Sequence, residues 1–242
     1  MLLLSLTNKL VKLIEMPFQI LEWQIKQNEC QKLSDNILLW QLRNRAPKVF
    51  DRDLEYPWML KNINIKKGKL LDIGSTIGYM LYDVLPKEIE INAINLNAQK
   101  DIPNVIQYEG DIRKTDIKDE TFDVITCIST LEHIGVEGRY HVKDDPEGDI
   151  KAMKEMHRLL KKNGQLILTV PYGIEDVLPI NKLYNKERMK KLFKGYQVIN
   201  EEYLKYNSKH AIWTTVTEQE AAETNWKKDR WYALALFVLK KI

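Results

Sequence analysis

The sequence predicts an α/β protein whose core is a Rossmann-like, doubly wound sheet of seven strands with the last strand antiparallel. From residue 69 onward, short β-prone runs alternate with helical stretches, and this alternation indicates parallel strands joined by right-handed crossovers. The last run follows closely on a charged stretch and is strongly β-prone, which favours its insertion as a reversed strand. The chain has 242 residues, 44% of them hydrophobic, which suits one core with an added arm. The predicted strands lie at residues 70–74, 91–96, 104–111, 122–130, 165–171, 196–204 and 232–241.

Two regions are expected, an N-terminal helical arm at 1–47 and a main domain at 48–242. Leucines recur at helical spacing in the arm, and Lys9 and Lys12 interrupt it long before the roughly 20 apolar residues that a membrane span needs. We therefore expect an amphipathic helix that caps the main domain, pairs with a second copy in a homodimer or contacts a membrane surface. Residues 48–60 read as an irregular segment that leads into the sheet.

Charge and cysteine content narrow the class of protein. The formal net charge is only +3, which does not favour a nucleic-acid partner. Cys30 and Cys127 are too few for a disulfide framework or a cysteine-based zinc site, so a reducing compartment and a cytoplasmic location are expected.

A glycine-containing turn follows the first predicted strand, in the stretch LDIGSTIG at residues 71–78. Gly74 and Gly78 allow a ligand to approach the backbone, and the following helix start offers free N–H groups at the carboxyl edge of the sheet. The pattern is neither the dinucleotide fingerprint nor the P-loop. A tight structural turn is the alternative interpretation of the glycines.

Polar side chains also end the third and fourth predicted strands. Asp111 closes the third strand, where it is placed either to accept a hydrogen bond from an exocyclic amine or to cap a turn. The fourth strand runs into CISTLEHI at residues 127–134, which brings the carboxylate of Glu132 and the imidazole of His133 to the same edge.

The stretches LLDIGSTIG, EGDI, FDVITCISTLEHI and HRLLKKNGQLILTVP together resemble the class I S-adenosylmethionine-dependent methyltransferases, in the branch that acts on small molecules, lipids and sugars. The resemblance covers about residues 68–173 well, and its signatures occur in the family's order at strand ends. It implies S-adenosylmethionine as the cofactor. The residues that match the family's cofactor site are Asp72, Gly74, Ser75 and Gly78 near the methionine part, Asp111 and Ile112 near adenine, and Ile128 and Ser129 beneath the cofactor.

This sequence departs from the family pattern at two positions. Thr76 stands where the family loop often has a glycine, and Asn95 stands where an acid usually binds both ribose hydroxyls. An amide still accepts one such bond, but without the charge assistance that makes a carboxylate bond roughly twice as strong. A non-catalytic or regulatory domain that binds S-adenosylmethionine is therefore an alternative.

Methyl transfer to oxygen needs alignment and a proton acceptor, and imidazole has a suitable ordinary pKa of about 6.5. His133 is the leading candidate for this base, with Glu132 as its orienting or alternative partner. A packing role beside the cofactor is the competing interpretation of His133. His141 and Tyr172 are expected in the substrate site.

An acidic segment at residues 144–149 precedes a predicted helix. Asp145 and Pro146 read as an N-cap and a first helical position, and acids near a helix start interact favourably with its dipole. A divalent ion or the recognition of hydroxyls or an amine are alternatives. No metal is assigned.

The expected acceptor is a small molecule or a glycan or lipid-linked sugar, methylated on oxygen. The sequence lacks the motifs of nucleic-acid amino methylation and of cytosine-C5 methylation, and the choice of acceptor rests on resemblance and elimination. Methylation of a small amine is an alternative. A nicotinamide-dependent oxidoreductase would share the sheet, but its glycine fingerprint is absent.

Overall fold

The computed structural model describes residues 51–74, 84–97, 102–136, 143–178, 181–207, 209–210, 212–229 and 231–242. The predicted N-terminal arm lies outside the described residues, so its contact with a membrane or a second copy stays a prediction. No helix within the described ranges has the length and apolar character needed to cross a membrane.

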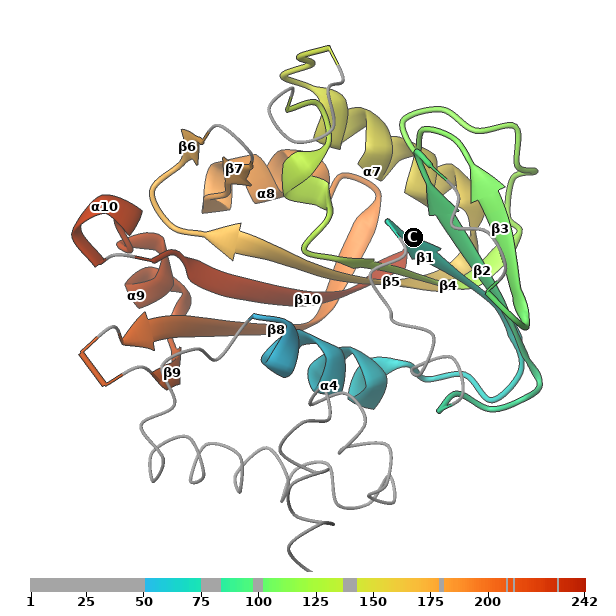
Figure 1. Ribbon diagram of the computed structural model, residues 1–242, viewed down its shortest axis with the longest axis horizontal. Coiled ribbons are helices and arrows are strands. Elements are labelled where there is room, and N and C mark those ends of the chain that lie inside the picture. The colour runs from blue at the N-terminus through green and yellow to red at the C-terminus, as the bar shows by residue number, and fades with distance from the viewer. Residues whose placement is uncertain are drawn as a thin grey trace, which may run out of the picture.

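One sheet of eight strands forms the centre of the described part (Figure 1). The strand order is β3-β2-β1-β4-β5-β10-β8-β9. The neighbours from β3 to β5 pair in parallel, whereas β10 is antiparallel to both β5 and β8. The strands are β1 (Gly68–Ile73), β2 (Ile89–Asn95), β3 (Val105–Glu109), β4 (Phe122–Ile128), β5 (Leu160–Tyr172), β8 (Tyr196–Asn207), β9 (Ile212–Val216) and β10 (Ala233–Lys241).

All seven predicted strands are present, and the reversed orientation of the last one is confirmed. The count of seven is wrong, because β9 adds an eighth strand antiparallel to β8. Strand β9 is a five-residue edge strand in which only Trp213 is buried, so it carries no clear apolar alternation. Two further strands, β6 (Asp176–Val177) and β7 (Lys182–Leu183), form a separate small antiparallel sheet.

Both faces of the central strands β1, β4, β5 and β10 are largely buried, and successive residues of these strands alternate between two apolar clusters. Leu71 packs in one cluster while its neighbour Leu70 packs in the other. In β10, Ala235 and Phe237 face one side and Leu236 faces the opposite side. Because side chains in a strand alternate with a period of two, a sheet covered on both faces needs such nearly continuous apolar runs.

Helices cover the two faces unequally (Figure 1). Helices α7 (Gly148–Leu159) and α8 (Lys186–Leu192) lie on one face, and α4 (Arg52–Asn62) lies on the other. The short helices η2 (Leu131–His133), α9 (Glu218–Ala222) and α10 (Trp226–Asp229) complete the described elements.

The structure corrects three local expectations. Most of the segment 48–60 that was expected to be irregular belongs to α4, which continues through Pro57 and buries Trp58 and Met59 against the sheet. Tertiary packing thus outweighs the helix-breaking tendency of proline. The sequence also predicts that Leu183 faces the core from a helix in the basic stretch INKLYNKERMKKLFKGY; Leu183 is buried, but it lies in β7 rather than in a helix.

The third correction concerns the start of α7. Its N-cap is Glu147, not Asp145. Asp145 instead lies in the preceding turn, where its N–H donates to the Gly135 carbonyl at 3.0 Å and its carbonyl accepts from Gly148 at 2.9 Å. A side chain at Gly135 would collide with the Asp145 carbonyl oxygen, at 2.1 Å from an added Cβ. The segment after β4 and the start of α7 are therefore in direct backbone contact.

A buried ion cluster ties four segments together on the α7 side. The carboxylate of Asp149 is fully buried and accepts from Arg188 Nη2 at 2.6 Å and from Lys182 Nζ at 3.2 Å. The Lys182 ammonium also donates to the Ile134 carbonyl at 3.1 Å and the Pro146 carbonyl at 3.4 Å. One carboxylate thus joins α7, α8, β7 and the segment after β4.

We predict that Asp149→Asn lowers the melting temperature by roughly 10 °C. Removing one partner of a buried ion group leaves uncompensated charge and costs about 3–5 kcal/mol. Thermal unfolding followed by circular dichroism measures this change. Glu187→Gln is the matched control, since it removes the carboxylate of an exposed ion pair with Lys190 and should leave the melting temperature unchanged. Equal melting temperatures for both variants would contradict the structural role of the cluster.

Candidate functional site

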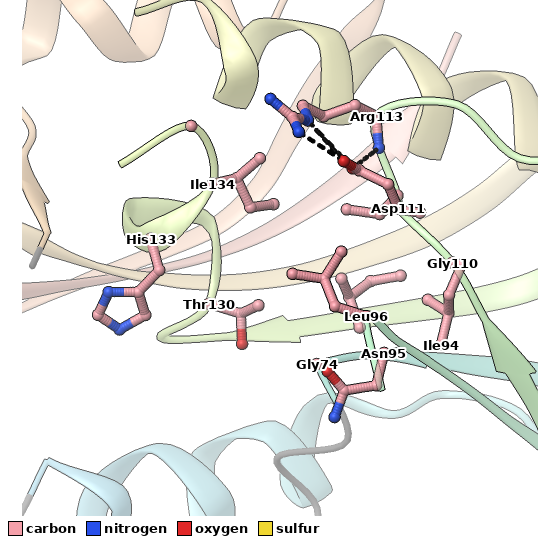
Figure 2. A pocket seen from close by; sticks show the side chains of 13 residues that line it. Gly74, Ile94, Asn95, Leu96, Gly110, Asp111, Arg113, Thr130, His133 and Ile134 are labelled. Carbon is pink, nitrogen blue, oxygen red and sulfur yellow. Dashed lines mark hydrogen bonds and ion pairs between the residues drawn. The ribbon is translucent and has the colours of Figure 1, made fainter. Parts of the chain in front are cut away.

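A cavity opens at the carboxyl ends of β1, β2, β3 and β4 (Figure 2). The chain builds outward from β1 through β2 to β3 and then places β4 on the other side of β1, so this edge is the topological switch point where ligands bind in open α/β sheets. The cavity encloses about 550 Å³, part of it open to solvent. Thr130 and His133 lie on one side in Figure 2, with Gly110 and Asp111 on the other.

Gly74 forms the part of the wall that follows β1. Its φ of +84° is in the left-handed region that favours glycine, and an added Cβ would lie 2.7 Å from Cγ2 of Thr130. The glycine therefore lets the ends of β1 and β4 close on each other. Ser75 and Gly78, the other predicted residues of this loop beside Asp72, lie outside the described residues.

Asn95 and Gly110 line the cavity at the ends of β2 and β3. The Gly110 N–H donates to the Asn95 carbonyl at 2.9 Å, which ties the ends of β2 and β3 together. A Cβ added at Gly110 would meet nothing within 4 Å, so the space beside this backbone is open. The predicted residue Ile112 adds an apolar surface.

Asp111 lines the cavity beside Arg113, and the two side chains form an ion pair (Figure 2). The carboxylate accepts from Arg113 Nη2 at 2.6 Å, from Nε at 2.9 and 3.1 Å, and from the Arg113 backbone N–H at 2.8 Å. Burial raises the pKa of Asp111, but these bonds and the Arg113 charge outweigh it and hold the pKa below its ordinary value. These three donors make four contacts, two on each carboxylate oxygen, which engages all of the about four lone-pair positions of the carboxylate.

The acidic segment before α7 is connected to this wall. Asp145 accepts from Arg113 Nη1 at 3.1 Å and from Lys151 Nζ at 2.8 Å. Asp145 and Asp149 of the acidic segment therefore have a structural role as partners in ion pairs. The described residues contain no group of three or more histidine, cysteine or acidic side chains arranged to hold a metal ion.

Ser129, at the end of β4, is held in an unusual conformation by a buried polar network. Its φ of +38° is in the left-handed region. Its N–H donates to Thr169 Oγ1 at 2.9 Å, its hydroxyl donates to Glu55 Oε1, and its carbonyl accepts from Arg52 Nη2 at 3.2 Å. Glu55 is fully buried, accepts from Thr169 Oγ1 at 2.6 Å and pairs with Arg52 at 2.5 Å. Helix α4 thereby fixes the direction in which the chain leaves β4.

His133 and Glu132 follow directly on this turn. His133 lines the cavity and is 8% exposed, whereas Glu132 is 4% exposed and lies behind it. His133 Nε2 is 3.7 Å from Glu132 Oε1. Burial raises the pKa of Glu132 to about 8, although the Arg52 charge counteracts part of the effect. Glu132 Oε2 is buried and has no hydrogen-bond partner within the described residues.

Several predicted site residues lie away from the cavity surface. Asp72 is fully buried in β1 and accepts from Thr126 Oγ1 at 2.8 Å. Ile128 is buried in the apolar cluster on the α4 side. Tyr172 donates its hydroxyl to Glu218 Oε1 at 2.7 Å and packs on Tyr203 in the interior. His141 lies outside the described residues.

The sequence analysis missed Arg113 and the residues on α4. Arg113 stands two residues after Asp111, a spacing at which an aspartate commonly accepts from the backbone. Glu55 is an acid three and four residues before Trp58 and Met59, so it shares the apolar face of a helix. These two local patterns are the signals that sequence reasoning could have used.

Two kinds of comparison place the chain among known proteins. Residues 84–242 match a family model described as "Caenorhabditis protein of unknown function, DUF268". The uncharacterized methyltransferase YcgJ of Bacillus subtilis is 26% identical over 145 residues, which are 54% of this chain and 52% of YcgJ. The chain spans about half the length of the curated relatives it matches.

Solved structures show the same fold at low sequence identity. The crystal structure of YcgJ has a TM-score of 0.51 and 16% identity, covering 78% of this chain and 97% of YcgJ. An S-adenosylmethionine-dependent methyltransferase from Methanosarcina mazei has a TM-score of 0.52 and 14% identity, covering 76% and 97%. The [4+2]-cyclase SpnF has a TM-score of 0.55 and 15% identity, covering 78% and 79%. The chain has the Rossmann-like fold of class I methyltransferases, and it belongs to the DUF268 family.

Proposed function

We propose that the chain is an S-adenosylmethionine-dependent methyltransferase that methylates an oxygen of a small molecule or of a glycan or lipid-linked sugar. The observation that carries the proposal is the cavity at the switch point, where Gly74, Asn95, Asp111 and His133 meet from four separate strand ends. The match to YcgJ, which is named a methyltransferase, supports the same reaction class.

The residues around the cavity suit S-adenosylmethionine. Open space beside Gly110 admits a ligand against the backbone, and Ile112 and Ile134 offer apolar surface to a flat ring. Asp111 lies on the cavity wall, where an exocyclic amine of adenine would replace part of its contact with Arg113. The Asn95 amide is placed to accept one hydrogen bond from a ribose hydroxyl.

Bound here, the cofactor supplies a methyl group on a sulfonium centre, and the chain supplies position and a proton acceptor. Alignment of the reacting groups contributes about 7–11 kcal/mol in well-oriented systems. His133 lies on the cavity wall and takes the proton of the acceptor hydroxyl. Glu132 lies behind it at 3.7 Å and orients the imidazole, and because burial keeps the Glu132 carboxyl protonated near neutral pH it supplies no negative charge to the imidazolium. We assign the base to His133 and an orienting role to Glu132.

The second candidate is a domain that binds the cofactor without methylating an acceptor. Asn95 favours it, because the amide lacks the charge of the usual acid at this position. The fold of SpnF, which is named a [4+2]-cyclase, also shows that this architecture carries other chemistry. Incubation with labelled S-adenosylmethionine and hydroxyl or amine acceptors separates the three outcomes: label on oxygen, label on nitrogen, or no transfer.

Calorimetry tests the cofactor site directly. We expect S-adenosylmethionine and S-adenosylhomocysteine to bind in the micromolar range and NAD not to bind. Asn95→Asp should tighten S-adenosylhomocysteine binding roughly threefold to tenfold, because a carboxylate forms stronger hydrogen bonds to hydroxyls.

The matched control for this experiment is Asn97→Asp. It makes the same substitution at an exposed position two residues later, outside the cavity. Its affinity should equal that of the wild type. No binding of either S-adenosyl compound to the wild type would overturn the proposed function, and equal affinities of the two variants would remove Asn95 from the cofactor site.

The raised pKa of Glu132 predicts how stability depends on pH. Because the folded state holds its proton up to about pH 8 while an unfolded chain releases it near 4.5, the free energy of unfolding falls as pH rises through this window. Glu132→Gln removes this contribution. We expect the variant to lose fewer degrees of melting temperature than the wild type between pH 5 and pH 9, with a difference of a few degrees.

Thermal scans at several pH values measure this difference, and Glu109→Gln at an exposed strand end is the control. The control should follow the wild-type pH response. If the melting temperatures of wild type and Glu132→Gln changed equally with pH, this result would show that burial does not raise the pKa of Glu132.

A further inference from the structure

Arg113 is a cation in the wall of the cofactor cavity to which the proposed function gives no role. Its side chain is 22% exposed, and in the view of Figure 2 it lies beside Asp111 at the end of the cavity opposite Gly74. The resemblance to the methyltransferases implies the methionine part near Gly74 and adenine near Asp111 and Ile112. Arg113 therefore lies at the end of the cavity where adenine is expected.

The guanidinium of Arg113 has more donors than its two acidic partners use. Nε and Nη2 donate to the Asp111 carboxylate, and Nη1 donates to Asp145 Oδ2 at 3.1 Å. A guanidinium carries five N–H groups, and these contacts engage three of them. Within the described residues, one N–H group on each terminal nitrogen has no acceptor. Because the side chain is partly exposed and lines the cavity, these groups are available to a ligand.

The charges at this end of the cavity favour an uncharged part of a ligand. Arg113 forms ion pairs with Asp111 and Asp145, and Lys151 pairs with Asp145 at 2.8 Å. Two acids and two cations cancel, so this group has no net positive charge that would attract a phosphate. A neutral heterocycle with hydrogen-bonding groups on its edge suits this group of side chains better than the phosphates of a dinucleotide do.

Asp111 and Arg113 offer an acceptor and a donor side by side. Nη2 of Arg113 is 2.6 Å from Oδ2 of Asp111. The edge of adenine has the opposite pattern, since its exocyclic amine donates and the ring nitrogen beside the amine accepts. A single asparagine or glutamine amide recognises this edge in DNA with one acceptor and one donor. The ion pair presents the same two groups, both charged, and charge-assisted hydrogen bonds are roughly twice as strong as neutral ones.

The contacts of the ion pair show how an amine would enter. Nε of Arg113 is shared between the two Asp111 oxygens, at 2.9 Å from Oδ2 and 3.1 Å from Oδ1. Loss of the longer contact frees Oδ1 for the amine, while Oδ2 and Asp145 still hold the guanidinium in place. The unused N–H of Nη2 then lies on a nitrogen that contacts the same carboxylate, next to the bound amine.

We infer that Arg113 donates a hydrogen bond to a ring nitrogen beside the exocyclic amine of the cofactor's adenine. Asp111 and Arg113 then determine together that the site accepts this base. The inference rests on the proposed function and adds a specificity-determining residue to its cofactor site. Replacement of that ring nitrogen by carbon should weaken binding roughly threefold to tenfold, the effect of one hydrogen bond.

Isothermal titration calorimetry on the full chain tests the inference with S-adenosylhomocysteine and its 1-deaza and 7-deaza analogues. The analogues lack N1 and N7 of the purine, which are the two ring nitrogens beside the amine. We expect the wild type to bind at least one analogue threefold to tenfold more weakly than S-adenosylhomocysteine. Arg113→Met should bind that analogue and S-adenosylhomocysteine equally, because the variant has no N–H group to donate.

Arg158→Met is the matched control. Arg158 also pairs with a carboxylate at 2.6 Å, that of Glu155, but it does not line the cavity, so this variant should keep the wild-type ratio of affinities. A purely structural role of Arg113 would weaken both ligands by the same factor in Arg113→Met, and this unchanged ratio would overturn the inference.

The wild type alone provides a second test that does not depend on the folding of any variant. Equal affinities of the wild type for all three ligands would overturn the inference while leaving the proposed function intact. Failure of S-adenosylhomocysteine itself to bind is a different result, which would reject the proposed function and the inference with it.

Discussion

The direction of the chain at Ser129 determines where one wall of the cofactor cavity lies. At this residue the backbone turns into a left-handed conformation that a serine adopts only at a cost, and contacts from Thr169, Glu55 and Arg52 hold it there. The residues of that wall, between Thr130 and Gly135, follow immediately. Helix α4 lies far from Ser129 in sequence but supplies two of its three partners, so the site is fixed by tertiary contacts and not by the local sequence.

This dependence explains which features the sequence predicted. Strand runs and the glycine after β1 are local patterns, and Gly74, Asn95, Asp111 and His133 all lie at or within a few residues of the carboxyl end of a strand, so topology brings them to one edge. Glu55 and Tyr184 come from segments whose position depends on packing across the sheet. The Asn95 side chain could be placed from sequence, whereas the engagement of Asp111 by Arg113 required coordinates.

The acidic segment before α7 illustrates the same limit. Read in sequence, its acids are consistent with a helix start, an ion or a ligand. In the structure Asp149 pairs with Lys182 and Arg188, which lie more than thirty residues later, and Asp145 pairs with Arg113, about thirty residues earlier. Partners at such separations leave no local signal, and their effect is to hold the wall of the cofactor cavity that follows β4 against α7.

Stability alone does not account for the polar atoms buried around that wall. Glu132 Oε2 and the Tyr184 hydroxyl are two of the four buried side-chain atoms that lack a partner in the described residues, and they interact with each other electrostatically. Each such atom lowers the free energy of unfolding by about 1–3 kcal/mol. A glutamine in place of Glu132 or a phenylalanine in place of Tyr184 would reduce this cost. Other buried acids are fully paired, as at Glu55 and Asp149, so the Glu132 carboxyl differs from them. We attribute its unfilled oxygen to its place 3.7 Å from His133, because a protonated carboxyl there orients the imidazole that lines the cofactor cavity.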